Sequence, residues 1–480
     1  RKVLEGDMRQ RLCVILLALW SLAALAAPPE GFTAAMERLQ GDPALNGAKI
    51  GILVQSLDDG AVWYAKNEGL PLIPASTAKL VTAALALEYL APDYRFTTTL
   101  AVDGPVNDGV LHGNLYLKGG GDPVLTPATF RAWAQQLYDG DDSANRPALR
   151  EIRGRIVIDN AFFPNPDPLR GPGWEKADLP WYYAAPPTAL ACNQNAVRLT
   201  VRGTAPGAPP SVTFDPPTAL FTVVNQAKTA NAVRKPLEVL PNGTTVRIIG
   251  GIAPGKEVVE RLSVPAPDRF AVEQFTAALR DAGITVTNDP ALKGTAEPAV
   301  LLTHHSPTLR EIIYPMLKDS DNHTAEQVRL TLLALYSLEP PVAGRYPIMV
   351  TNYCELSDIV TGNFFLVDGS GLSRQDRMSP RGAVRILTHM ALSAHFAVWY
   401  HSLPVAGRDG TLKTRMADTR AAGNARAKTG TMTGVSSLAG YVTSQAGERL
   451  VYAVMLNDYR GSSAAARRLQ DSIVGLLADQ

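Results

Sequence analysis

The sequence of 480 residues has little of what marks several specialised classes of protein. Its three cysteines exclude a disulfide-dense scaffold, and its seven histidines form no His-Glu-x-x-His zinc motif. Lys and Arg number 46 against 45 Asp and Glu, so the net charge of +1 provides no basic field for a nucleic acid. The 39 glycines and 36 prolines have no regular period, which excludes a collagen-like chain or a solenoid. We therefore expect a globular protein of enzyme size with no nucleic-acid partner, no metal and no cofactor.

The first 26 residues have the pattern of a secretory signal peptide. Arg9 precedes an apolar run over Leu12–Ala26 that ends in small residues. This run is shorter than the ~20 residues that span a bilayer. We predict a signal peptide over residues 1–26 and export to the periplasm, which is compatible with peripheral membrane association but not with a permanent anchor. Cys192 and Cys354 would be the cysteines of the mature chain, and the sequence leaves open whether they form a disulfide.

Both ends of the chain carry elements that fit a single sheet. Two apolar runs around a tight turn predict a hairpin over Lys49–Asn67, and Ser76–Leu90, apolar on nearly every face, predicts a buried helix. Further apolar patterns predict three strands and a helix near the C-terminus: Arg426–Met432, Ser436–Ser444, Arg449–Asn457 and Ala464–Leu477. Together these elements would form an antiparallel sheet covered by helices, an α/β (α+β) fold with a discontinuous main domain.

The middle of the chain, from about Arg95 to Pro298, has a different pattern. Leu115–Leu117, Ala128–Tyr138 and Arg155–Ile158 predict a strand, a helix and a strand, whereas Ala196–Glu260 is a series of short Val- and Thr-rich runs. We therefore predict an α/β domain nested in an inserted, mostly-β domain. The predicted boundaries are 27–95 and 299–480 for the main domain, 96–111 and 193–298 for the inserted mostly-β domain, and 112–192 for the nested α/β domain.

Ser76 and Lys79 are the first candidates for chemistry. Three positions apart at the start of a predicted helix, their side chains would lie on one face, about one turn from each other. A serine hydroxyl needs a base to become a nucleophile, and a lysine amine can serve when burial favours its neutral form. The alternative is a helix-start serine beside a lysine that extends to solvent. The apolar run from Leu80 to Leu85 favours the first interpretation, because an unpartnered charge would be costly there.

Two more short motifs follow in order. Ser320-Asp321-Asn322 lies in a polar turn before a predicted helix over Thr324–Leu338, and Lys428-Thr429-Gly430 lies in the first strand of the C-terminal group. Taken alone, the first motif is typical of a helix N-cap and the second of an exposed strand. A glycine in such a strand allows another backbone to approach closely.

The three motifs in this order resemble the signature of penicillin-binding proteins and class A β-lactamases. The long stretch between Ser76 and Ser320 makes the chain similar to the low-molecular-mass penicillin-binding proteins with a large insertion between the first two motifs, the serine-type D-Ala-D-Ala carboxypeptidases and D,D-endopeptidases. Other stretches that resemble this family are Leu117–Pro123, Asp368–Arg374, Lys428–Thr431 and Gly434–Leu438. The resemblance covers essentially the whole mature chain, except that Pro340–Asn363 matches no motif. It implies the penicillin-binding-protein/β-lactamase-like fold.

The resemblance also implies an acyl-enzyme mechanism that acts on peptidoglycan stem peptides, with β-lactams as covalent inhibitors. Ser76 would attack the carbonyl of the penultimate D-alanine, with Lys79 as its base. Ser320 would relay a proton to the leaving amine, and Asn322 would hold the substrate amide. Water would then release the acyl group.

The third motif is implied to bind the end of the substrate. Lys428 would offer positive charge to the terminal carboxylate and keep Lys79 unprotonated, while Thr429 and its neighbours Gly430 and Thr431 would line the carboxylate and oxyanion sites. The backbone N–H groups of Ser76 and Thr431 would bind the oxyanion.

A substrate-specificity site is implied by residues outside the three motifs. Asp178 and Tyr183, with Arg374 after Ser373, would contact the charged end of the residue that precedes the D-alanines. An amino-carboxylate end such as that of meso-diaminopimelate carries one cation and one anion, which Asp178 and Arg374 would bind separately. The alternative is that Asp178 caps a turn and Arg374 pairs with a surface carboxylate.

Other functions remain to be weighed against this hypothesis. A β-lactamase has the same three motifs but lacks a long insertion, and a non-catalytic peptidoglycan-binding homologue would not need all the polar residues that are present. Other serine hydrolases are disfavoured because the chain has no Gly-x-Ser-x-Gly elbow. The sequence leaves open the balance of carboxypeptidase and endopeptidase activity and the oligomeric state.

Overall fold

The structure is a computed structural model, which describes residues 28–480 except 145, 164–169, 290–291, 293–296, 337–344, 358 and 360–363. The predicted signal peptide therefore lies outside the described residues, as does part of the stretch 340–363 that matched no motif. None of the described helices is long and apolar enough to cross a membrane.

The two ends of the chain form one antiparallel sheet, which confirms the predicted fold class. The strand order is β19-β20-β21-β1-β2. These strands are β1 (Lys49–Ser56), β2 (Val62–Lys66), β19 (Arg426–Met432), β20 (Val435–Thr443) and β21 (Arg449–Asn457). The N-terminal hairpin joins the C-terminal strands because β1 pairs with β21 along its whole length, from Lys49 opposite Asn457 to Ser56 opposite Leu450.

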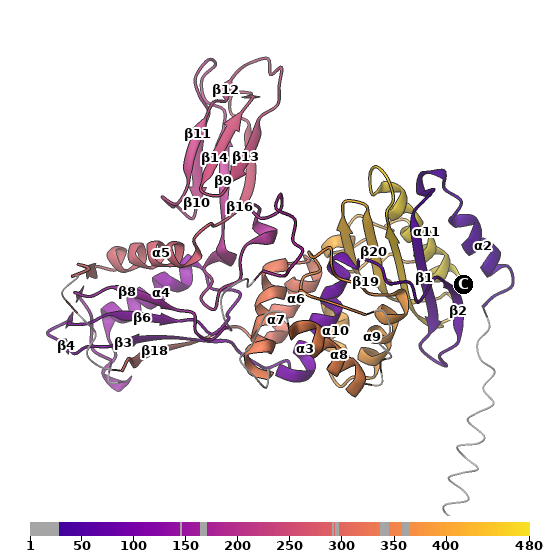
Figure 1. The fold of residues 1–480 in the computed structure, drawn as a ribbon, viewed down its shortest axis with the longest axis horizontal. Coiled ribbons are helices and arrows are strands. Elements are labelled where there is room, and N and C mark those ends of the chain that lie inside the picture. Colours follow the sequence, from indigo (N-terminus) through magenta and orange to yellow (C-terminus); the bar gives the residue numbers. More distant parts are fainter. Residues whose placement is uncertain are drawn as a thin grey trace, which may run out of the picture.

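Helices cover both faces of this sheet (Figure 1). On one face α2 (Phe32–Leu39) and α11 (Ala464–Asp479) bury their apolar sides against the strands. The other face packs on a layer of six helices: α3 (Lys79–Leu90), α6 (Leu309–Lys318), α7 (Asn322–Tyr336), α8 (Tyr346–Leu356), α9 (Pro380–Leu392) and α10 (Phe396–Ser402). Helix α3 lies inside this layer and buries all its residues from Lys79 to Leu87, as its uniformly apolar sequence predicted.

The long central stretch builds separate sheets, which form two lobes beside the helical layer (Figure 1). The first lobe contains the sheet β18-β3-β6-β8 and the small sheet β17-β7-β5-β4, with two helices. Its elements are β3 (Thr97–Val102), β4 (Val106–Asn107), β5 (Val110–Leu111), β6 (Leu115–Lys118), α4 (Pro127–Asp139), β7 (Glu151–Ile152), β8 (Ile156–Asp159), α5 (Pro267–Asp281), β17 (Thr285–Val286) and β18 (Ala299–His305). The predicted strand, helix and strand are β6, α4 and β8, and β6 and β8 are parallel.

The second lobe is all β. It contains the sheets β10-β9-β16, β11-β14-β13 and β12-β15. Its strands are β9 (Ala196–Arg202), β10 (Ser211–Asp215), β11 (Thr222–Asn225), β12 (Lys228–Thr229), β13 (Glu238–Asn242), β14 (Thr245–Ile249), β15 (Gly251–Ile252) and β16 (Glu257–Ser263).

The strand pairing groups some residues differently from the predicted domains. Strand β18, which the sequence analysis placed in the main domain, pairs with β3, and β3 in turn pairs with β6 of the predicted nested domain. The pairing follows from the alternation of apolar residues in these strands, which bury Leu100, Leu115 and Leu302 in one core. The domain boundaries themselves stay a prediction.

Candidate active site

Ser76 lies in a tight 3₁₀ turn, Ala75–Ala78, immediately before α3. The predicted helix therefore begins at Lys79, three residues later than expected. Ala75 has a left-handed backbone (φ 47°), and a Cβ on Gly371 would lie 1.9 Å from the Ala75 carbonyl oxygen. The loop around Gly371 thus packs directly against the turn that carries Ser76, and only glycine fits there.

Lys79 is fully buried and connects the first two motifs. Its Nζ lies 3.0 Å from the Ser76 Oγ, 2.7 Å from the Asn322 Oδ1 and 2.7 Å from the Ser370 carbonyl oxygen. Burial lowers the pKa of Lys79 to about 8, and the negative charges of Asp368, Asp321 and Glu326 oppose this shift. A neutral amine has two N–H groups and one lone pair. As an ammonium, Lys79 donates to all three oxygens; in the neutral form, with its two N–H groups on Asn322 and Ser370, its lone pair would face the Ser76 hydroxyl.

Ser320 and Lys428 form the second half of the centre. The Lys428 Nζ donates to the Ser320 Oγ at 2.8 Å and to the Thr429 carbonyl oxygen at 2.9 Å. Burial, followed by the charge of Lys79, holds the pKa of Lys428 well below its usual range. Burial is thus the main cause of the lowered pKa at both lysines. The charge of Lys79 adds to the shift at Lys428, whereas the charge of Lys428 is not among the causes of the shift at Lys79. Ser320 has a left-handed backbone (φ 63°), which turns its hydroxyl out of the helix that follows.

Strand β19 lies, at Gly430, against the turn that carries Ser76. A Cβ on this residue would lie 2.6 Å from the Pro74 carbonyl oxygen and 3.0 Å from the Ser76 backbone nitrogen. This close approach is what the glycine in the third motif predicted. Thr431 follows on the same edge strand, opposite Ser436 of β20. The Thr429 hydroxyl donates to the Thr411 hydroxyl at 2.7 Å.

A buried carboxylate that the sequence analysis missed supports the Lys79 site. Glu326 on α7 accepts hydrogen bonds from the backbone N–H groups of Gly369 (3.0 Å) and Ser370 (2.8 Å), and pairs with Arg329 at 2.6 Å. This fixes the Ser370 carbonyl that accepts from Lys79. Burial raises the pKa of Glu326, and the Arg329 charge opposes the rise. The signal in the sequence was a Glu and an Arg three positions apart, on one side of a predicted helix.

Asp178 and Tyr183 come from the central stretch and reach the second motif. The Tyr183 hydroxyl donates to Asp178 at 2.9 Å, while the Tyr183 carbonyl oxygen accepts from the Asn322 side chain at 2.9 Å. Burial and the Asp178 hydrogen bond raise the pKa of Tyr183. The structure therefore brings Asp178 and Tyr183 together and ties them to Asn322.

Arg374 pairs with a partly exposed carboxylate, which is the alternative that the sequence analysis left open, and its role toward substrate stays a prediction. Its guanidinium pairs with Glu175 at 2.8 Å and donates to the Thr433 carbonyl oxygen at 3.2 Å. The preceding Ser373 donates to the Pro172 carbonyl oxygen at 2.5 Å. Glu175 is a further residue that sequence reasoning missed, and both members of the ion pair are partly exposed.

The central stretch makes two more contacts with α7. The Gln327 amide donates to the Thr188 carbonyl oxygen at 2.9 Å. The Gln194 amide donates to Asp321 of the second motif at 2.5 Å, and Asp321 also accepts from the Thr324 hydroxyl at 2.7 Å. Sequence reasoning missed Gln194, because a single glutamine in a turn carries no signal of a distant partner.

Cys192 and Cys354 do not pair with each other. Cys192 and Cys354 are buried free thiols in different hydrophobic cores. Burial raises the pKa of the Cys354 thiol to about 12. Within the described ranges, no group of three or more His, Cys, Asp or Glu side chains could hold a metal ion.

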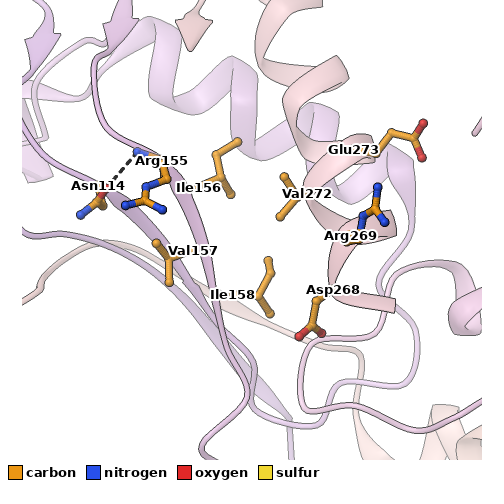
Figure 2. Close-up of a pocket in the computed structure, with 9 residues that line it drawn as sticks. All are labelled: Asn114, Arg155, Ile156, Val157, Ile158, Asp268, Arg269, Val272 and Glu273. Atoms are coloured by element: carbon orange, nitrogen blue, oxygen red, sulfur yellow. Dashed lines mark hydrogen bonds between the residues drawn. The ribbon is translucent and has the colours of Figure 1, made fainter. Parts of the chain in front are cut away.

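A cleft of about 690 Å³ between β8 and α5 contains none of the predicted site residues (Figure 2). Ile158 and Val272 line its apolar part, while Arg155 lies beside Asn114. Its two carboxylates already have partners, since Asp268 accepts from Asn160 and Glu273 from Thr218 and Ala219. We assign it no function.

Comparisons with known proteins agree with this geometry. Residues 32–480 match the D-Ala-D-Ala carboxypeptidase 3 (S13) family. The chain is 31% identical to a D-alanyl-D-alanine carboxypeptidase of Actinomadura sp. (strain R39), over 99% of this chain and 91% of that protein. It is 27% identical to the D-alanyl-D-alanine carboxypeptidase DacB of Haemophilus influenzae, over 86% of each.

A solved structure has the same fold. Penicillin binding protein 4 (dacB) from Haemophilus influenzae matches with a TM-score of 0.79 and 24% identity, over 93% of this chain and 99% of that one. The chain belongs to the D-Ala-D-Ala carboxypeptidase 3 (S13) family and is a serine hydrolase.

Proposed function

We propose that this serine D,D-peptidase cleaves the D-Ala-D-Ala bond of peptidoglycan stem peptides through an acyl-enzyme on Ser76. The observation that carries the assignment is the 3.0 Å contact between the buried Lys79 Nζ and the Ser76 Oγ. Because the other two Lys79 contacts are to acceptors, the neutral amine has its lone pair directed at the hydroxyl. Lys79 is thus the base.

Each proton then has a donor and an acceptor. The Ser76 proton passes to Lys79 as Oγ attacks the carbonyl carbon of the penultimate D-alanine. The backbone N–H groups of Ser76 and Thr431 stabilise the oxyanion. When the C–N bond breaks, Ser320 relays the proton held by Lys79 to the amine of the departing D-alanine. Water later hydrolyses the ester, giving one proton to Lys79, which returns it to the Ser76 Oγ. Lys428, in contact with Ser320, orients this relay.

The remaining site residues hold the substrate. A bound terminal carboxylate favours the protonated form of Lys428, whose pKa burial lowers in its absence, so Lys428 provides charge and Thr429 a hydrogen bond. Asn322 holds the substrate amide. Gly430 is required because any side chain would collide with the nucleophile turn. We also propose that penicillin acylates Ser76, and a solved relative of this fold is described as complexed with a β-lactam.

The test of this function is product analysis. The purified protein is incubated with monomeric disaccharide pentapeptide and with cross-linked dimer, and the products are identified by mass. Release of D-alanine from the pentapeptide supports carboxypeptidase action, and conversion of the dimer to monomers supports endopeptidase action on D-Ala-diaminopimelate bridges. Steady hydrolysis of penicillin would instead indicate a β-lactamase. If neither peptide is cleaved and no covalent penicillin adduct forms, the protein is a non-catalytic homologue.

We propose that the enzyme is exported and acts in the periplasm, after removal of residues 1–26. Its substrate is outside the cytoplasmic membrane, and the basic start and apolar run of the first 26 residues support export. Sequencing of the mature N-terminus tests this. Peripheral membrane association is compatible with this location and is tested by cell fractionation.

Arg374→Ala should slow cleavage of a diaminopimelyl peptide about 10- to 100-fold more than cleavage of a short acyl-D-Ala-D-Ala. The lost interaction is a charge-assisted hydrogen bond worth about 1.5–3 kcal/mol, which only the longer substrate can form. The measurement is kcat/KM on both peptides. Glu175→Gln is the matched control, because it removes the ion pair but keeps the arginine. An equal loss on both peptides would show that Arg374 supports the common step.

A further inference from the structure

A second cleft, of about 590 Å³, lies where the start of α4 meets the sheet β10-β9-β16. Three arginines line it, namely Arg131 of α4, Arg198 of β9 and Arg261 of β16, with Asp215 of β10 as the only carboxylate in its lining. Arg198 is directly opposite Asp215 on one neighbouring strand and Arg261 on the other. These three side chains therefore share one face of the sheet.

The charges in this cleft are unbalanced. Within the part of the chain that the structure describes, none of the three arginines forms an ion pair with a carboxylate. Like charges directly opposite each other on neighbouring strands are destabilising, and Arg198 and Arg261 are such a pair. Four residues further along the same face, Arg202 is instead opposite Glu257, with 3.7 Å between their charged groups. An anion bound between the arginines would relieve this repulsion.

The cleft is connected to the catalytic centre through two side chains. Arg261 donates to the Gln194 side-chain oxygen at 3.1 Å, and the Gln194 amide donates to Asp321 at 2.5 Å. Arg261 also stacks on the Tyr182 ring, with its guanidinium carbon 4.0 Å from the ring centre. These contacts fix Arg261 but leave most of its N–H groups available.

The turn that presents Gln194 is itself unusual. Three consecutive non-glycine residues, Asn193–Asn195, have left-handed backbones, with φ of 53°, 58° and 50°. Such a conformation is uncommon for residues other than glycine and persists only where the surroundings hold it. Here the buried Asn195 holds it by donating to the Pro186 carbonyl oxygen and the Thr188 hydroxyl. The link between cleft and second motif is thus rigid.

We propose that this arginine cleft is a second substrate site, which binds a free carboxylate of the peptidoglycan peptide away from the bond that is cleaved. The planar forks of arginine match a carboxylate in two-pronged geometry. A volume of about 590 Å³ suits part of a peptide rather than a single ion. The proposal rests on the proposed function, because it takes the stem peptide as the ligand.

The test compares three substrates: a cross-linked muropeptide dimer with free carboxylates, the same dimer amidated only at carboxylates other than those assigned above to Lys428, Thr429 and Arg374, and a short N-acyl-D-Ala-D-Ala. For Arg198→Ala and Arg131→Ala we expect kcat/KM on the free-acid dimer to fall about tenfold, through KM, with no change on the short substrate. Arg202→Ala, on the same face of the same strand, is the matched control and should behave as wild type. Wild type should prefer the free-acid dimer to the amidated one, and the Arg198 variant should not distinguish them.

Other results would overturn the proposal. In the arginine variants, kcat/KM could fall equally on the dimer and the short substrate, or not fall on either. The wild-type enzyme could also cleave the free-acid and amidated dimers equally well. If wild type cleaves none of the substrates, the proposed function has failed instead. Thermal unfolding gives a second measurement, because Arg198→Ala removes both the repulsion from Arg261 and the attraction to Asp215, and should change Tm no more than Arg202→Ala does in the absence of substrate. A clearly larger fall in Tm would indicate a purely structural arginine.

Discussion

Ser76→Ala is expected to abolish covalent labelling by benzylpenicillin and release of D-alanine. The Ser76 Oγ is the hydroxyl that the Lys79 amine faces at 3.0 Å, whereas Ser320 faces Lys428. The fold should survive, since one hydroxyl near a helix start contributes only about 1 kcal/mol. Intact mass after incubation with benzylpenicillin, together with thermal unfolding, is the measurement.

Ser370→Ala provides a matched control for this variant. Ser370 also contacts Lys79, but through its main-chain carbonyl oxygen, which alanine retains. Its hydroxyl accepts from the Leu372 backbone N–H at a long 3.4 Å, its side chain also helps to lower the pKa of Glu326, and the Lys79 amine contacts the main-chain oxygen rather than the hydroxyl. Ser370→Ala should therefore still be labelled. An adduct on the Ser76 variant would mean that another residue is the nucleophile.

Lys79→Arg is expected to slow acylation by about 10²- to 10⁴-fold. A guanidinium stays protonated at any pH that the fold tolerates, so it cannot accept the Ser76 proton. The measurement is the second-order rate constant for benzylpenicillin acylation. Lys428→Arg is the comparison, because it keeps the positive charge where charge rather than basicity is needed, and it should retain part of the activity. Equal rates for wild type and Lys79→Arg would refute the assignment of the base.

The same base predicts a pH dependence. Because burial lowers the pKa of Lys79 to about 8, the neutral amine is the minor form at neutral pH. Below this pKa the neutral fraction falls tenfold for each pH unit, so the wild-type acylation rate should rise with pH and level off above about 8. In Lys79→Arg this rise should be absent. A flat wild-type profile between pH 6 and pH 8 would contradict a titrating lysine.

The sequence predicted the sheet and the three motifs because each depends on a local pattern. Alternating and uniformly apolar runs specify strands and a buried helix from neighbouring residues alone. The prediction for Lys79 also rested on local evidence, since a lysine among Leu80 to Leu85 must be buried with partners. Lys79 is indeed fully buried.

What the sequence could not predict depends on backbone strain and on distant contacts. The tight turn at Ser76 exists because Gly371 and Gly430, both far along the chain, press their backbones against it. The partner of Arg374 is Glu175 in the central stretch, a pairing that no periodicity encodes. Glu326 and Arg329 could be seen as a pair three positions apart, but the loop that Glu326 holds, over Gly369 and Ser370, could not be predicted.

The contacts of Asn322 with distant parts of the chain also bear on the stage of folding at which the active site is completed. Asn322 meets the Tyr183 carbonyl oxygen across 139 positions of sequence and Lys79 across 243. Contacts of this kind form late in folding, because a long loop must close before they contribute any stability. Helix α3 and the hairpin β1–β2 depend on near neighbours and can form earlier. We therefore expect catalytic competence to be gained after most of the secondary structure, and to depend on the contact between Asn322 and the Tyr183 carbonyl oxygen.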